Sequence, residues 1–311
     1  MKTKKIRRTI LTIAILAVGY LGGRNNVLQN VFPATVATEQ PAKQTPPVSP
    51  DYQAIADQDF KSGAAAYLPI NNEQSQLTAT DWQGEKIVYG QLDQLNRTTS
   101  VTAYLSKRNL GKSEGRTRQI WNPTGWHNQP LIVNGRRITP QNRGHLIAYT
   151  LTFNFDQNGN FQAGQPGSLD NPLNLATQSA YSNQKTMQIF EEKVRTALEA
   201  NKKVIYKVTT VFRGNELMPR GYWVQAISTD GTLNFNDYVW NVEPGVVFDY
   251  MTGRSHLDAS MQVKDGQNIV DRTKQQVKHF SKQKKEVATR IILVATSFAS
   301  LFFHCLTQCS G

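Results

Sequence analysis

The hydrophobic pattern between residues 51 and 255 combines short apolar runs with one long amphipathic segment. Residues 88–92 and 100–105 are rich in residues that favour strands. Asn134–Gly135 separates an apolar run at 131–133 from residues 136–139, and this dipeptide predicts a hairpin with a type I′ turn.

A helix is predicted over residues 178–200, where apolar residues recur at helical spacing: Ala180, Met187, Phe190, Val194, Ala197 and Leu198. Four strand-like runs follow, separated by Gly, Asp, Asn or Pro, at 204–212, 222–227, 235–240 and 246–250. Strands before a helix and a run of strands after it predict an α+β domain with a largely antiparallel sheet.

The N-terminal segment has the pattern of an export signal. Five basic residues precede an apolar stretch from Ile10 to Leu21, and no close cleavage site of the Ala-x-Ala kind follows. We therefore expect residues 1–30 to be a signal anchor, with a cleaved signal peptide or a buried N-terminal helix as alternatives. The basic flank predicts a cytoplasmic N-terminus and export of the rest. Residues 31–50 contain five prolines and are expected to form an extended linker.

The C-terminal segment, residues 256–311, is first basic and then apolar. Its apolar run, 291–303, is shorter than the roughly 20 residues that a membrane span needs. We expect a helix that lies on a membrane or packs on a partner, with a transmembrane hairpin as the alternative. Both cysteines, Cys305 and Cys309, fall here, so the body of the chain contains neither a disulfide nor a cysteine-ligated metal.

Composition and charge narrow the function of the remaining domain, residues 51–255. Hydrophobic residues make up 39% of the chain and charged residues 19%, which excludes a disordered or polytopic membrane protein. The net charge is +12, yet within this domain the excess is concentrated in residues 97–143, with nine basic residues and one acid, Glu114. Such a segment indicates a polyanionic partner, either nucleic acid or an anionic cell-wall polymer.

Candidate chemistry gathers around His145 and the predicted helix. His145 follows Asn142-Arg143-Gly144, and a histidine beside an arginine suits acid–base work on an anion. The helix carries Asn183 and, eight residues later, Glu191, about 80° away around the axis at 3.6 residues per turn. Glu191 also forms an i,i+4 pair with Arg195. An amide oxygen, a carboxylate and a guanidinium near a histidine suit hydrated Mg²⁺ and a phosphodiester.

These motifs together resemble the DNA/RNA non-specific endonucleases, the ββα-metal or His-Me finger nucleases. The resemblance rests on residues 142–145, the run from Asn174 to Gln184, the Glu191-x-x-x-Arg195 spacing, and Pro123-Thr-Gly-Trp126-His127 upstream. It covers roughly residues 80–255 and is strongest to the membrane-anchored DNA-entry nucleases and secreted DNases of Gram-positive bacteria. It implies a ββα-metal finger that carries the catalytic site.

The resemblance also implies roles for individual residues. His145 resembles the general base that activates a water, and Asn183 the sole direct protein ligand of Mg²⁺, for which Mn²⁺ can substitute. Glu191 resembles the residue that holds the water shell of that ion, and Asn174 a polar residue that shapes the site. Two arginines, Arg143 and Arg195, resemble the cations on the phosphate.

One position departs from the family pattern, because most members have Asp where this chain has Asn142. A neutral amide cannot act as a carboxylate, so activity is expected to be reduced or its pH profile moved. A surface protein that binds DNA or another polyanion without cutting it therefore remains the alternative. A zinc-dependent HNH nuclease lacks support, since no cluster of histidines accompanies His145.

Substrate binding is assigned to four arginines of the basic segment: Arg116, Arg118, Arg136 and Arg137. Trp121 and Trp126 are candidates for stacking on bases, with core packing as the alternative. The expected substrate is DNA, with RNA left open. The expected location is the cell membrane, with the nuclease domain outside the cell, and secretion is the alternative.

Overall fold

The computed structural model describes residues 49–264, and the predicted signal, most of the linker and residues 265–311 lie outside this range. Between residues 49 and 264, no helix combines the length and the apolar character that a membrane crossing requires. The polypeptide remains packed up to Lys264, whose backbone N–H donates to the Ala64 carbonyl at 2.8 Å.

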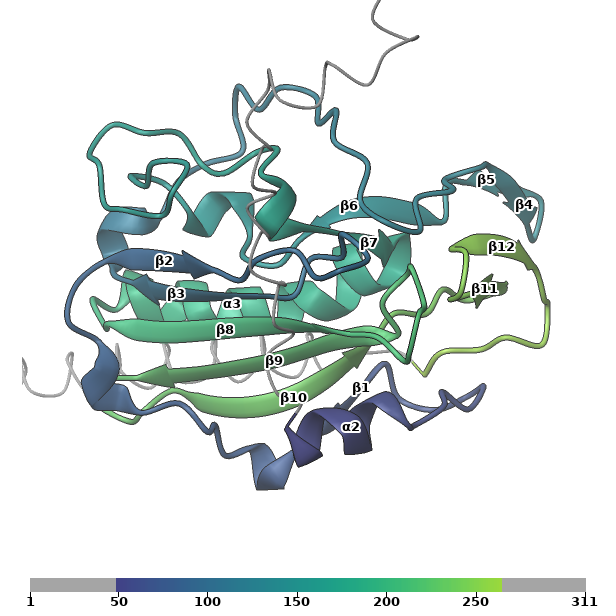
Figure 1. Cartoon of the computed structure of the whole chain (residues 1–311), viewed down its shortest axis with the longest axis horizontal. Helices are drawn as coiled ribbons and strands as arrows, with labels where there is room; N and C mark the ends of the chain where they lie inside the picture. Colours follow the sequence, from purple (N-terminus) through teal and green to yellow (C-terminus); the bar gives the residue numbers. More distant parts are fainter. Residues whose placement is uncertain (1–48, 265–311) are drawn as a thin grey trace, which may run out of the picture. The chain divides into compact units, whose positions relative to one another are not determined.

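A six-stranded antiparallel sheet forms the centre of this body (Figure 1). Its order is β1-β10-β9-β8-β3-β2, and each strand runs against its neighbours. The strands are β1 (Tyr67–Pro69), β2 (Lys86–Tyr89), β3 (Ser100–Leu105), β8 (Val204–Val211), β9 (Gly221–Ser228) and β10 (Asn234–Trp240). The α+β class and the largely antiparallel sheet are thus confirmed, as are the predicted strands at these positions to within a few residues.

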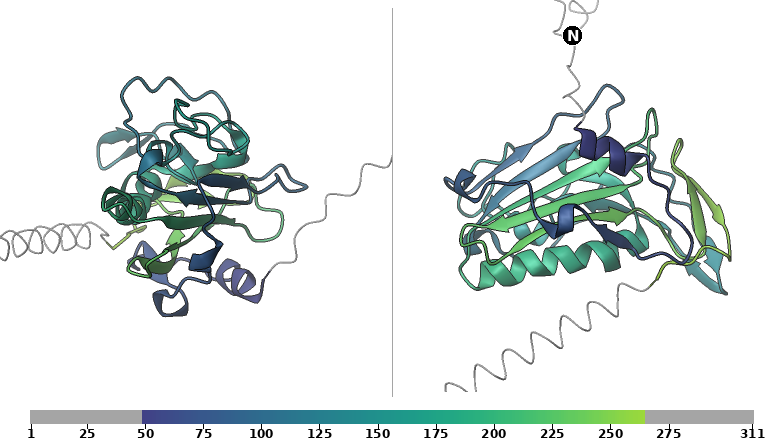
Figure 2. Two further views of the ribbon diagram at one scale, coloured as in Figure 1. Left: turned by 90° about the vertical axis from the view of Figure 1, so that its left-hand side faces the viewer. Right: turned by 90° about the horizontal axis from the view of Figure 1, so that it is seen from below.

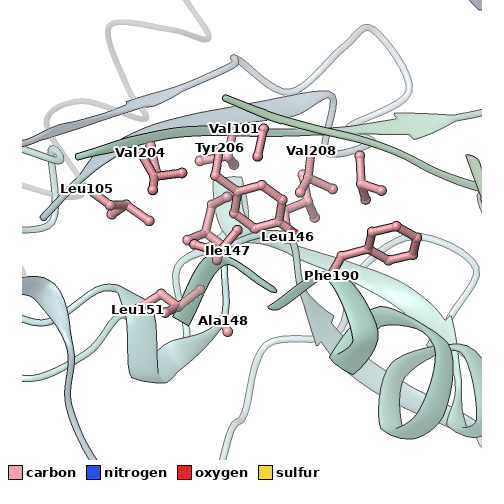
Figure 3. Close-up of a cluster of buried hydrophobic side chains, with 14 of the residues drawn as sticks. Val101, Leu105, Leu146, Ile147, Ala148, Leu151, Phe190, Val204, Tyr206 and Val208 are labelled. Carbon is pink, nitrogen blue, oxygen red and sulfur yellow. The ribbon is translucent and has the colours of Figure 1, made fainter. Parts of the chain in front are cut away.

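The two faces of the sheet are covered by different helices. Figure 2 (right) shows the long helix α3 (Met187–Glu199) along one face and the short helix α2 (Pro50–Ala56) on the other. On the α3 side, Phe190 belongs to one buried cluster with strand residues such as Tyr206 and with the segment that follows His145 (Figure 3). This segment, residues 146–148, is almost wholly buried, so the chain beside His145 is fixed by the main core.

The ββα finger consists of a second, two-stranded sheet followed by the α3 helix. β6 (Gln141–His145) pairs antiparallel with β7 (Leu175–Ser179), and residue 180 begins the helix. The first turns include a π-helical segment, η7 (Ser182–Thr186), before α3. The predicted helix start at residue 178 is wrong, because Gln178 and Ser179 belong to β7. Both strands of the finger escaped prediction as strands, since polar residues buried on both faces show no alternation.

Two further hairpins pack together at one end of the body (Figure 1). They are β4 (Leu131–Val133) with β5 (Arg136–Ile138), and β11 (Val246–Asp249) with β12 (Arg254–Leu257). Asn134 and Gly135 have φ values of 49° and 72°, so the predicted type I′ turn is confirmed. Short 3-10 turns complete the path: η2 (Asn71–Glu73), η3 (Ala79–Asp81), η4 (Lys107–Asn109), η5 (Tyr149–Leu151) and η6 (Pro172–Asn174).

The pairing of β6 with β7 depends on the missing side chain of Gly144. A Cβ atom there would lie 2.1 Å from Gln178 Oε1 and 2.7 Å from Gln178 Cβ. Gln178 in turn donates from Nε2 to Ser182 Oγ at 3.0 Å, at the start of η7. Gly144 therefore lets β6 approach the strand from which the helix departs.

We expect Gly144→Ala to destabilise the fold by ~1–3 kcal/mol, because the added methyl group overpacks this contact. Urea unfolding of the full chain measures the change. Gln178→Ala removes the nearest clashing atom, so the double variant should recover part of the loss. A Gly144→Ala protein as stable as wild type would show that β6 and β7 can move apart to accommodate the methyl group without a loss in the free energy of unfolding.

Candidate active site

A groove with a volume of about 1380 Å³ runs between the ββα finger and the segment that connects β3 to β4. The catalytic candidates that line it are His145 and Arg143 from β6, Asn183 from η7, and Glu191 and Arg195 from α3. Residues more than 50 positions apart in the sequence thus share one cavity. The groove joins the candidates that the sequence analysis singled out as base, metal ligand and phosphate cations.

The side chain of His145 is 7% exposed and is oriented by a backbone carbonyl. Its Nε2 lies 2.9 Å from the carbonyl oxygen of Leu169. Because a carbonyl only accepts hydrogen bonds, Nε2 must carry the proton, and Nδ1 of the neutral ring is left as the acceptor. The neutral ring is therefore held in the tautomer in which Nδ1 has the lone pair that can accept a proton.

Burial lowers the pKa of His145 from 6.5 to about 4, and the positive charge of Arg116 acts in the same direction. The Leu169 and Ser168 carbonyls and the Asp170 carboxylate oppose this shift. The low pKa leaves the imidazole neutral, and able to accept a proton, at neutral pH.

The carbonyl that orients His145 belongs to a polar network. Gln119 donates from Nε2 both to the Leu169 carbonyl and to the Arg143 carbonyl, each at 3.3 Å. Its Oε1 accepts from Arg116 Nη2 at 3.2 Å. The segment that connects β3 to β4 is therefore hydrogen-bonded, through Gln119, to the backbone at Arg143 and at Leu169, the residue whose carbonyl orients His145.

Asn183 lies in the π-helical turn, and its side-chain amide forms no hydrogen bond with any part of the chain that the structure describes. A π turn absorbs one extra residue. Asn183 and Glu191 are eight residues apart, but with one residue absorbed they are spaced like residues about seven apart in a regular α-helix. The angle between their side chains around the helix axis is then roughly 20° instead of ~80°. The π turn thereby places the amide and the carboxylate on one face, above the groove.

Glu191 is half-buried, and burial raises its pKa to about 7, while the nearby Arg195 lowers it. The ion pair in the structure, however, joins Arg195 to Glu192, with Nε 3.8 Å from Oε2. Arg195 also donates from Nη2 to Thr150 Oγ1. The expected i,i+4 pair of Glu191 with Arg195 is therefore replaced by the i,i+3 pair of Glu192 with Arg195. The Glu191 carboxylate lines the groove.

Arg143 is partly committed to the protein. Its Nε donates to the Trp121 carbonyl at 2.6 Å and its Nη2 to Asn122 Oδ1 at 2.6 Å. The guanidinium lies 4.4 Å from the ring centroid of Trp126, which is half-buried in the groove wall. Asn142 also lines the groove.

Asn174 has a structural position instead. It is fully buried, its Oδ1 accepts from the Ile147 N–H at 2.9 Å, and its Nδ2 donates to the Ile147 carbonyl at 3.0 Å. Both polar groups are thus used to hold the chain two residues after His145. Asn174 does not line the groove, and it shapes the site only through this backbone.

The basic residues divide into two groups. Arg116 lines the groove, whereas Arg118 is exposed outside it, and Arg136 and Arg137 lie exposed on the β4–β5 hairpin. Two lysines that the sequence pattern did not single out also line the groove, Lys185 and Lys193. Their proximity to Asn183 and Glu191 in the sequence was the available signal. The groove wall carries five cationic side chains and two carboxylates, so it suits an anion.

The donor set of the groove fits a hard divalent cation. Within residues 49–264 the amide oxygen of Asn183 has no hydrogen-bond partner, and Glu191 offers a carboxylate on the same helix face. Oxygen donors in small number suit Mg²⁺, which keeps several of its waters. Nowhere in residues 49–264 do three His, Cys, Asp or Glu side chains gather as an all-protein cage would require.

Comparisons with known proteins identify a nuclease family and similar nucleases. The model of the DNA/RNA non-specific endonuclease family matches residues 74–230. A deoxyribonuclease from Streptococcus dysgalactiae subsp. equisimilis is 23% identical over 266 residues, 73% of this chain and 76% of the relative.

Two crystal structures of NucA from Streptococcus agalactiae resemble this structure. The one with no metal bound is 31% identical with a TM-score of 0.53, and the one with a magnesium ion bound is 30% identical with a TM-score of 0.54. Each match covers 62% of this chain and 87% of NucA.

We expect His145→Asn to raise the stability of the fold selectively at low pH. The unfolded chain takes up a proton near pH 6.5 and the folded chain near pH 4. The native state therefore loses up to ~3 kcal/mol as the pH falls through this window. Asn removes that loss, so the free energy of unfolding of the variant minus that of wild type should rise as the pH falls.

Urea unfolding between pH 7 and pH 4 measures this difference. Buried acids with raised pKa, including Glu191 and Glu243, act with the opposite sign, but they do so in both proteins and cancel. A difference that stays constant across the window would contradict the lowered pKa of His145.

Proposed function

Because the chain belongs to the DNA/RNA non-specific endonuclease family, we propose that it hydrolyses phosphodiester bonds of DNA in this groove. RNA is a second candidate substrate, since contacts to the backbone carry little sequence information. The observation that carries the proposal is the neutral His145 ring, oriented by the Leu169 carbonyl within a groove of cations. The proposed cofactor is Mg²⁺, with Mn²⁺ as a substitute.

His145 Nδ1 accepts a proton from the attacking water, because the ring is neutral at neutral pH and its Nε2 is bonded to the Leu169 carbonyl. Arg116, Arg143 and Arg195 bind the oxygens of the scissile phosphate. Asn183 and Glu191 would hold the divalent ion, which when bound offsets negative charge on the phosphate and the departing oxygen. Asn174 supports the site from behind by fixing the backbone of Ile147.

The proposed place of action is outside the bacterial cytoplasm. The basic N-terminal residues followed by the apolar stretch 10–21 support export, with the chain anchored in the membrane or, alternatively, secreted. The proline-rich linker then separates the nuclease domain from the membrane.

A non-catalytic DNA-binding protein is the second candidate, and one observation favours it. Asn142, in place of the usual Asp, lines the groove close to His145. A neutral amide there cannot supply the charge of a carboxylate. The cutting assay below separates the two functions.

We expect the full chain with Mg²⁺ to nick supercoiled plasmid, and a chelator to stop the reaction. His145→Ala should slow nicking by ~10²–10⁴-fold, because a positioned base is lost. His127→Ala is the matched control, since His127 is half-buried but does not line the groove. Wild-type protein that binds plasmid without nicking it would establish the non-catalytic alternative, and a His145→Ala protein that nicks at the wild-type rate would remove His145 from the mechanism.

Asn183→Ala should shift the Mg²⁺ concentration for half-maximal nicking upward by about tenfold or more, because the proposed direct ligand is lost. Asn183→Asp keeps an oxygen at the same position and should retain activity at low Mg²⁺. Titration of Mg²⁺ in the nicking assay measures both effects. Activation curves that coincide for wild type and Asn183→Ala would refute the assignment.

A further inference from the structure

Two consecutive large apolar residues are exposed in the connection that borders the groove. Ile120 is 79% exposed and Trp121 is 40% exposed. The preceding residues, 112–119, are polar or glycine, and Arg116 and Gln119 among them line the groove. Burying exposed aromatic and branched side chains against an apolar surface lowers the free energy, because it removes apolar area from water. Such a pair at the border of a binding site therefore indicates a ligand with an apolar face.

The backbone of this pair is hydrogen-bonded to residues beside the site. The N–H groups of Ile120 and Trp121 donate to the Asp170 carboxylate at 3.0 to 3.1 Å. The Trp121 carbonyl accepts from Arg143. Asp170 follows the residue whose carbonyl orients His145, and Arg143 lies two residues before that histidine. The apolar pair is thereby anchored on both sides to the residues that hold the catalytic candidate.

The surroundings of the pair identify the ligand class. Arg116 and Arg118 lie within five residues of the pair on the same connection, so this stretch combines apolar side chains with positive charge. This combination suits single-stranded nucleic acid, in which bases are free to stack on side chains while cations follow the backbone. A stacked duplex hides its base faces and offers them only where a side chain wedges between base pairs.

We propose that Ile120 and Trp121 contact the face of an unstacked base beside the scissile phosphate, so that the protein binds the bases of single-stranded DNA as well as its backbone. The inference rests on the proposed function, because it places the phosphate at His145. It adds a contact with the bases to a site that otherwise contacts only the backbone.

The test compares a single-stranded oligonucleotide with an abasic oligonucleotide of the same length, which keeps the phosphates and lacks the bases. Affinities are measured by fluorescence anisotropy with full-length His145→Ala protein, so that neither strand is cut. Adding Ile120→Ser and Trp121→Ser should weaken binding of the normal strand by about tenfold or more, given typical base-stacking contributions. Binding of the abasic strand should change less than about twofold.

Val88→Ser is the matched control, because Val88 is a 51% exposed apolar residue on β2. Its neighbour Ile87 packs in the core on the α3 side, so Val88 points to the opposite face of the sheet. This control should leave both affinities unchanged. Circular dichroism verifies that every variant is folded.

Three outcomes overturn the inference. Unchanged affinity for both strands would show that the pair does not touch DNA. Binding of the same variants to phosphatidylglycerol vesicles is measured in parallel, and a loss of affinity confined to the vesicles would assign the pair to a membrane surface. Equal losses on both strands would show that the pair acts through Arg143 and the backbone. Failure of the proposed function is detected separately, as absence of plasmid nicking by the protein that retains His145.

Discussion

The hydrogen bond from His145 Nε2 to the Leu169 carbonyl determines which nitrogen of the ring is free to accept a proton. Its geometry depends on two segments that are distant in sequence. Gln119 holds the Leu169 carbonyl, and Asn174 holds the backbone of Ile147 just beyond the histidine. Burial within this frame also lowers the pKa of the ring, so the same packing sets both the tautomer and the charge of the proposed base.

The metal side of the groove depends on how the helix leaves β7. Ser179 donates from Oγ to the Val242 carbonyl and accepts from the Ser182 N–H, while the Glu243 carboxylate accepts from the Tyr181 N–H at 2.6 Å. These contacts satisfy N–H groups that the first helical turn leaves unpaired. They fix the start of the helix against the end of the main sheet, and the π turn then sets the direction of Asn183.

The positive charge of the groove comes from residues that are close in space but far apart in the sequence. The basic segment 97–143 predicts an anionic partner, yet of its nine basic residues only Arg116 and Arg143 line the groove. Lys185, Lys193 and Arg195 complete the cationic wall from the helix. The exposed arginines of the β4–β5 hairpin face solvent outside it, where salt screens their attraction to a backbone.

The sequence by itself determined the α+β class, most strands of the main sheet and the type I′ turn. It also singled out His145, Asn183 and Glu191 as candidates, and the structure brings these three residues into one groove. These features are local, because side-chain periodicity, turn dihedrals and short motifs are encoded within a few neighbouring residues. The tertiary structure alone decided the pairing of β6 with β7, the structural position of Asn174 and the pairing of Arg195 with Glu192. It also decided that the π turn places Asn183 on the same helix face as Glu191, and which tautomer His145 adopts. Each of these depends on a contact between distant segments, such as Gly144 against Gln178 or His145 against Leu169, and no local pattern records such a contact.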